Sequence, residues 1–166
     1  MVSEDDIRQW FEQLKKPLPP EILDKLQDKI IKYAPLEALS YLFRDEGPSC
    51  LISALIFVVA HFANQEPVYA GAIRYVLCGF AQHKGSGVRH AVADALGLLP
   101  AGGDTREALA VLSQDRIEAV AIAARESLED LSKRYFDPAE RAKEKQASRA
   151  EDERALASGE KTAEQL

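Results

Sequence analysis

The sequence predicts an all-α fold: a short α-solenoid of about eight helices followed by a polar C-terminal tail. One observation is a repeat, because 88–99 (VRHAVADALGLL) recurs as 120–131 (VAIAARESLEDL) with four identical aligned residues. The other is that apolar residues recur at three- and four-residue spacing between turns rich in proline and glycine. This pattern is typical of amphipathic helices joined by short turns.

Length and charge narrow the class of protein. The chain has 166 residues, of which 46% are hydrophobic, and this suits one domain with a substantial core. The formal net charge of −6 argues against broad binding to nucleic acid or anionic membranes, which depends on clustered Lys and Arg. The acidic N-terminus lacks the plan of a signal peptide, and the apolar run 50–63 is shorter than a membrane span. We therefore expect a cytoplasmic protein with no membrane partner.

A cap and two prolines mark the first two helices. Ser3 followed by Asp6 predicts a variant capping box at the start of the first helix, which ends before Pro17. Trp10 on this helix is either a binding anchor or an aromatic side chain that seals the end of the solenoid. Pro20 suits the first turn of the second helix. The predicted buried face of the second helix comprises Ile22, Leu23, Leu26, Ile30 and Tyr33.

The third and fourth helices differ in how much of their surface is apolar. Pro35 opens the third helix, which ends at 45–48. Its predicted inward face comprises Leu36, Leu39, Leu42 and Phe43, and its other face Glu37, Ser40, Tyr41 and Arg44. The fourth helix, 49–64, is apolar nearly all round. Neighbouring helices must therefore cover it on several sides, and a dimer interface is the alternative.

The fifth helix is expected over 68–83, and the glycine-rich turn 84–87 ends it. Its predicted buried face comprises Tyr69, Ala72, Ile73, Val76, Leu77 and Phe80. A contrasting stripe on the same helix comprises Gly71, Arg74, Tyr75, Cys78 and Gln82.

The recurring segment and two further helices complete the helical domain. Segment 88–99 forms the sixth helix, and Pro-Ala-Gly-Gly after it is a turn. Asp104 or Thr105 is expected to cap a short seventh helix, and Asp115 starts the eighth. The predicted inward residues of the sixth helix are Ala91, Val92, Ala95, Leu96 and Leu99.

The composition becomes polar from residue 138 onward. Segment 138–166 combines Ala with six basic and seven acidic residues and has no apolar stripe to bury. We expect a frayed helix or a disordered tail there, and a helix induced by a partner is the alternative. The sequence thus divides into a helical domain, 1–137, and a charged tail, 138–166.

Residues 87–131 resemble HEAT-like repeats of the phycobilisome-lyase type. The matching features are a V-R-x-A-x-x-A-L-G helix start, a Gly/Pro turn, a short Leu-rich helix and an Asp, Asp115, that opens the next repeat. Ala121 stands where the first copy has Arg89, so the Asp/Arg pattern is not expected to continue. The resemblance implies stacked antiparallel helix pairs, in which the third, fifth and seventh helices line a concave face.

Under that pairing, the contrasting stripes of these three helices form the candidate partner-binding surface, and a merely solvated face is the alternative. The candidate residues are Glu37, Tyr41, Arg44, Arg74, Tyr75 and Arg106. Because Tyr and Arg are enriched at binding hot spots, we expect a non-enzymatic adaptor or regulator that binds a segment of another protein. The alternative implied by the resemblance is a tetrapyrrole-binding or bilin-lyase-like protein, in which Arg74 or Arg106 meets a propionate. The acidic balance weakens a third reading, recognition of damaged DNA.

No catalytic or metal-binding motif stands out, and we expect no cofactor. The histidines, His61, His83 and His90, form neither an H-E-x-x-H pair nor a zinc pattern with the two cysteines. Cys50 and Cys78 lie in apolar helical patterns, and we interpret them as packed thiols of a reducing compartment, with a disulfide as the alternative.

Overall fold

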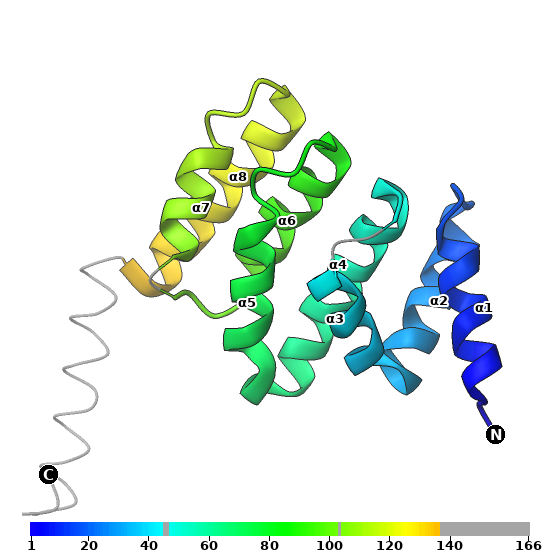
Figure 1. Cartoon of the computed structure of the whole chain (residues 1–166). Coiled ribbons are helices and arrows are strands. Elements are labelled where there is room, and N and C mark those ends of the chain that lie inside the picture. Colours follow the sequence, from blue (N-terminus) through cyan, green and yellow to red (C-terminus); the bar gives the residue numbers. More distant parts are fainter. Residues whose placement is uncertain (45–46, 103, 137–166) are drawn as a thin grey trace, which may run out of the picture. The chain divides into compact units, whose positions relative to one another are not determined.

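The computed structural model describes residues 1–44, 47–102 and 104–136, and within them all regular structure is helical (Figure 1). This confirms the predicted all-α class. The predicted tail, 138–166, lies outside the described residues. The chain divides into two compact units, Met1–Leu128 and Glu129–Leu166. The α-helices are α1 (Glu4–Leu14), α2 (Pro20–Tyr33), α3 (Pro35–Arg44), α4 (Ser49–Gln65), α5 (Ala70–Gly79), α6 (Ser86–Leu98), α7 (Thr105–Leu112) and α8 (Glu118–Leu131), with a 3-10 turn at Pro67–Tyr69 and a π turn at Ser132–Phe136.

The helix starts follow from local chemistry in most places. At α1 the backbone N–H of Asp6 donates to Ser3 Oγ at 3.2 Å, and the Ser3 N–H donates to Asp6 Oδ2 at 3.0 Å, which confirms the capping box. Prolines open α2 and α3, as predicted. The cap of α7 differs from the prediction, because the Asp104 side chain makes no capping bond and Thr105 Oγ1 accepts from the Gly102 N–H at 3.1 Å.

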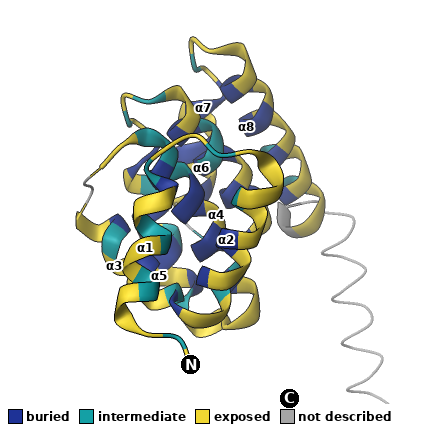
Figure 2. Ribbon diagram, turned by 90° about the vertical axis from the view of Figure 1, so that its right-hand side faces the viewer, coloured by how far each residue is buried: buried dark blue, intermediate teal, exposed yellow. Residues whose placement is uncertain are grey.

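Helix α4 is the centre of the first unit. Ten of its seventeen residues are buried, and it contacts α1, α2, α3, α5 and α6, as its apolar sequence required. Helices α2 and α6 both pack against α4, and their buried residues are dark blue in Figure 2. A second row is formed by α3, α5 and α7, in which each helix contacts the next.

The predicted apolar faces of α2, α3 and α5 are too broad. Ile22 and Tyr33 of α2 are exposed, although Leu26 and Ile30 beside them are buried. In α3 the neighbouring helices cover the side that carries Ala38, Leu39 and Leu42. Leu36 and Phe43, seven residues apart, share an adjoining side that no helix covers, and both are exposed. Ala72 of α5 is exposed as well.

Gly97 of α6 lies directly against Ser127 of α8. The Ser127 hydroxyl donates to the carbonyl of Ala93 at 2.8 Å. A Cβ atom at position 97 would lie 2.8 Å from the Cβ of Ser127 and 3.3 Å from its Cα. We therefore expect Gly97→Ala to lower the free energy of unfolding by about 1–3 kcal/mol, because the added methyl group overpacks this contact. Urea denaturation of the full chain measures the change.

A second glycine on the surface provides the control for this prediction. A Cβ at Gly71 would meet nothing within 4 Å, so Gly71→Ala should leave stability unchanged or raise it by up to about 1 kcal/mol. The cost of Gly97→Ala should also shrink when Ser127→Gly is already present, because the obstructing side chain is then gone. Equal stability of Gly97→Ala and Gly71→Ala would contradict the close approach of α6 and α8.

Candidate partner-binding surface

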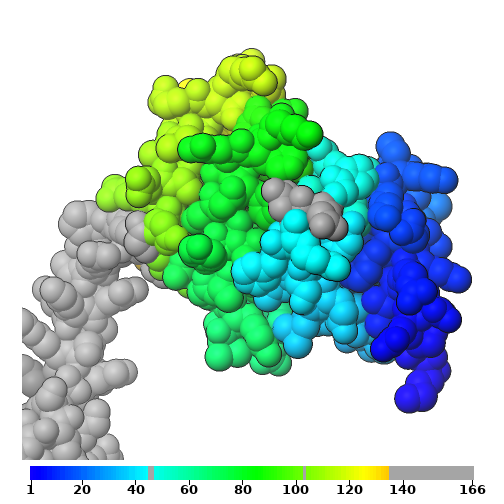
Figure 3. Space-filling model, in the orientation of Figure 1, coloured from blue at the N-terminus to red at the C-terminus, as the bar shows by residue number. Residues whose placement is uncertain are grey.

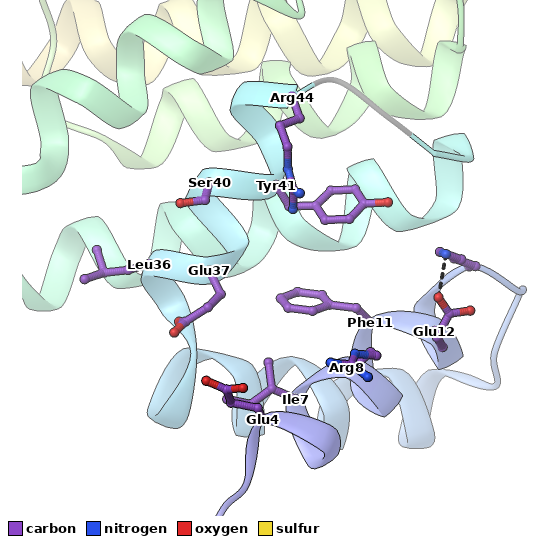
Figure 4. A pocket seen from close by; sticks show the side chains of 11 residues that line it. Glu4, Ile7, Arg8, Phe11, Glu12, Leu36, Glu37, Ser40, Tyr41 and Arg44 are labelled. Carbon is purple, nitrogen blue, oxygen red and sulfur yellow. Dashed lines mark hydrogen bonds and ion pairs between the residues drawn. The ribbon is translucent and has the colours of Figure 1, made fainter.

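A groove of about 480 Å³ runs between α1 and α3. The rings of Phe11 and Tyr41 stack across it, with their centroids 5.9 Å apart and their planes inclined by 23° (Figure 4). The guanidinium carbon of Arg44 lies 5.1 Å from the centre of the Tyr41 ring, a cation–π contact. Three acidic and three basic side chains surround the apolar floor of this α1–α3 groove: Glu4, Glu12, Glu37, Arg8, Lys15 and Arg44.

Two further hollows lie along the second row of helices. The hollow between α3 and α5 has a volume of about 350 Å³, and the hollow between α5 and α7 about 380 Å³. Both are lined by Cys78, Gly79 and Asp104, so the two hollows adjoin each other, and together they are called here the α3–α5–α7 groove. Figure 3 shows the face on which these helices run from cyan through green to yellow-green.

Exposed apolar side chains line the α3–α5–α7 groove. Phe43 of α3, Tyr75 of α5 and Val111 of α7 are 58%, 72% and 49% exposed. Beneath them the floor is made by residues that belong to the core of the unit: Leu42, Val76, Phe80, Ala81 and Ala108. A small folded domain normally scatters its exposed apolar residues, and a row of them along a hollow is typical of an interaction surface.

The six candidate residues from the sequence do not gather at one place. Glu37, Tyr41 and Arg44 line the α1–α3 groove. Tyr75 lines the hollow between α3 and α5. Arg74 and Arg106 line neither groove.

Arg74 links α5 to the turn that follows α6. Its Nη1 donates to the carbonyl of Pro100 at 3.4 Å, and its Nε lies 3.7 Å from Asp104 Oδ1. The guanidinium also lies close to Gly102, where a Cβ atom would be 2.6 Å from Nη2. Arg74 therefore holds the turn and orients Asp104, so Arg74→Glu would change the local fold together with any binding.

The pKa of the Cys78 thiol reflects the burial and the charges in the α3–α5–α7 groove. Burial, and after it the negative charge of the Asp104 carboxylate, raise the pKa of the Cys78 thiol to about 11. The positive charge of Arg74 opposes this rise with a smaller effect. A thiol with this pKa is almost fully protonated at neutral pH, so Cys78 acts here as an apolar lining residue rather than a nucleophile.

Sequence reasoning missed several residues of the two grooves, among them Phe11, Phe43, Gly79, Asp104, Glu107 and Val111. The helical spacing of apolar residues predicts that Phe43 points inward. This spacing does not specify which side of α3 the neighbouring helices cover. A signal for Gly79 existed, since glycine inside a helical pattern costs about 1 kcal/mol relative to alanine and therefore points to a close approach or an open space. Nothing in the sequence paired Phe11 with Tyr41, which lie 30 residues apart.

The cysteine and histidine side chains have separate surroundings in the part of the chain that the structure describes. Cys50 and Cys78 are free thiols, and no group of three or more His, Cys, Asp or Glu side chains converges on a metal position there. The three histidines contact separate partners. The His61 ring packs on Phe57, His83 Nδ1 accepts from a backbone N–H, and His90 faces Asp94 at 3.3 Å. Among the described helices, none has both the length and the apolar character needed to span a membrane.

Comparisons of the chain with protein-family models, with curated proteins and with solved structures found no match. The grooves and the side chains that line them are therefore the observations from which a function can be argued.

Proposed function

We propose that the helices of Met1–Leu128 form a short HEAT-like solenoid and that the protein is a non-enzymatic protein–protein interaction module, an adaptor or a regulator. The pairing of Arg89 with Asp115 supports the HEAT-like assignment. These are the arginine of the V-R-x-A helix start and the aspartate that opens the next repeat, and they meet at 2.7 Å. The two rows of helices, with α3, α5 and α7 in one of them, support it further.

The observation that carries the proposed function is the row of exposed apolar side chains, Phe43, Tyr75 and Val111, along a groove on one face. A partner segment that lies along this groove would remove their surface from water, and this is the main source of affinity in protein interfaces. The α1–α3 groove, with Glu37, Tyr41 and Arg44, extends the proposed surface. We include Arg74 and Arg106 in the proposed surface as residues that lie outside the two grooves. We also propose a cytoplasmic location, which the two free thiols support.

Affinity capture from the native cell extract tests this proposal. The full chain is compared with Phe43→Ala/Tyr75→Ala, which removes two rings from the groove. A captured protein, identified by mass spectrometry and then purified, should bind this variant at least about tenfold more weakly, since hot-spot aromatic residues contribute about 2 kcal/mol each.

The matched control is Ile22→Ala/Phe57→Ala, which removes two exposed apolar side chains from α2 and α4. It should bind the partner with unchanged affinity. Equal weakening by both variants, or capture of no protein, would contradict the proposed surface. Co-purification of a coloured small molecule without a protein would favour the tetrapyrrole alternative instead.

A further inference from the structure

We infer that the α3–α5–α7 groove binds a basic amphipathic helix of the partner, with apolar side chains seated at Gly79 and Lys or Arg side chains facing Asp104 and Glu107. The inference rests on the proposed function and specifies its partner. Three features of the groove lead to it: the state of its backbone, the sign of its charge and the open space at its centre.

The backbone of the groove favours a helical occupant. The groove is walled by α3, α5 and α7, so the regular structure that lines it is helical. An extended segment would find no strand edge there and would lose the hydrogen bonds of its own backbone to water. A helix satisfies those groups internally. Since packed helices lie about 8–10 Å apart and a helix rises 1.5 Å per residue, crossing from α3 to α7 takes about 11–13 residues.

The charge of the groove favours a basic occupant. Within the described residues, the charged side chains that line its two hollows are Asp104 and Glu107, both acidic. Arg74 offsets Asp104 only in part, because it also bonds Pro100 and approaches Asp104 no closer than 3.7 Å. The Asp104 side chain remains 51% exposed. The α1–α3 groove has equal numbers of acidic and basic side chains and therefore selects neither sign.

The thiol of Cys78 lies in the field of these same two charges, Asp104 and Arg74. It lies on the floor shared by the two hollows, where the charge of Asp104 raises its pKa more than the charge of Arg74 lowers it. At this thiol the negative charge of Asp104 therefore outweighs the positive charge of Arg74. A cationic side chain at the rim would be attracted, and an acidic one would be repelled.

Gly79 provides the space for an apolar side chain of the occupant. It is exposed at the end of α5 and lines both hollows, and a Cβ atom there would meet nothing within 4 Å. No packing inside the unit therefore requires a glycine at this position. The missing side chain leaves a depression beside Phe43, Tyr75 and Val111 into which an apolar side chain of the occupant fits.

Selection from a phage library of random helical peptides, with the full chain as bait, tests the inference. We expect the enriched peptides to carry apolar residues at three- and four-residue spacing together with an excess of Lys and Arg. The best of them, made synthetically, should bind Gly79→Trp and Glu107→Lys at least about tenfold more weakly than wild type, as measured by fluorescence anisotropy. Its affinity should also fall as salt is raised.

The control is Gly71→Trp, which adds the same ring to an equally open position of α5 outside the groove. It should leave peptide binding unchanged, and melting curves should show that both tryptophan variants are folded. Enrichment of acidic or uncharged peptides, binding that ignores Gly79→Trp, or no enrichment at all would overturn the inference. If affinity capture still yields a protein sensitive to Phe43→Ala/Tyr75→Ala, the proposed function stands and only the basic helical partner is excluded.

Discussion

Replacing Arg89 with alanine is expected to lower the free energy of unfolding by about 3–5 kcal/mol. Arg89 is only 7% exposed, and its guanidinium donates to both carboxylate oxygens of Asp115, at 2.7 and 3.2 Å. Its Nη1 also donates to the carbonyls of His83 and Lys84, at 2.8 and 3.1 Å. Alanine removes the charged partner of a carboxylate that is only 10% exposed and keeps only the backbone N–H of Ile117 as a donor at 2.9 Å. It also removes the guanidinium that donates to two carbonyls, and these losses lower the stability. Urea denaturation of the full chain measures it.

Two variants control for the charge and for the geometry of this pair. Arg8→Ala breaks an ion pair with Asp5 in which both side chains are more than 70% exposed, so it should change stability by less than about 1 kcal/mol. Arg89→Lys keeps the positive charge but loses the bidentate contact with the carboxylate. Its decrease in the free energy of unfolding should lie between those of Arg8→Ala and Arg89→Ala. A stability of Arg89→Ala equal to that of Arg8→Ala would show that the pair does not tie α6 to the segment before α8.

The same pair predicts a dependence of stability on pH. Hydrogen bonds from Arg89 hold the pKa of Asp115 below its ordinary value of 3.8. Because the folded-state pKa is the lower one, the contribution is complete above the unfolded pKa and is lost as pH falls through the folded pKa. The stability difference between wild type and Asp115→Asn should therefore be constant from pH 7 to about pH 5 and shrink below about pH 4. A difference that grows on acidification would contradict this sign.

Leu96→Ala is expected to lower the free energy of unfolding by about 2–5 kcal/mol. The Leu96 side chain is fully buried in α6, the helix that packs along α4. Alanine removes the apolar contacts of three carbon atoms and leaves a cavity that rigid helix packing fills only in part. A thermal or urea denaturation curve of the full chain reports the loss.

Leu98 on the same helix is the matched control for this prediction. Its side chain is 49% exposed, so Leu98→Ala removes the same atoms from a position that water already reaches. Leu98→Ala should lower the free energy of unfolding by less than about 1 kcal/mol. Curves for the two variants that coincide would mean that α6 does not bury Leu96 against its neighbours.

The sequence by itself determined the helices and the character of the central one. The capping box at Ser3 and the prolines at 20 and 35 define helix starts through bonds and steric limits that act within a few residues. The nearly uniform apolar surface of α4 required cover on several sides, whichever helices supplied it. The contrasting stripes of α3 and α5 predicted Tyr41, Arg44 and Tyr75 as surface candidates, and these three residues line the grooves.

Only the tertiary structure decided which apolar side chains stay exposed and how the polar ones are used. Phe43 and Leu39 look alike in the sequence, but neighbouring helices cover only the side of α3 that carries Leu39, so Phe43 remains at the surface of a groove. Arg74 is a candidate for partner binding from the sequence, and only the structure shows that the turn after α6 places a carbonyl and a carboxylate beside it. Periodicity specifies a helix and its apolar arc, whereas burial and ion pairing depend on segments that arrive from elsewhere in the chain.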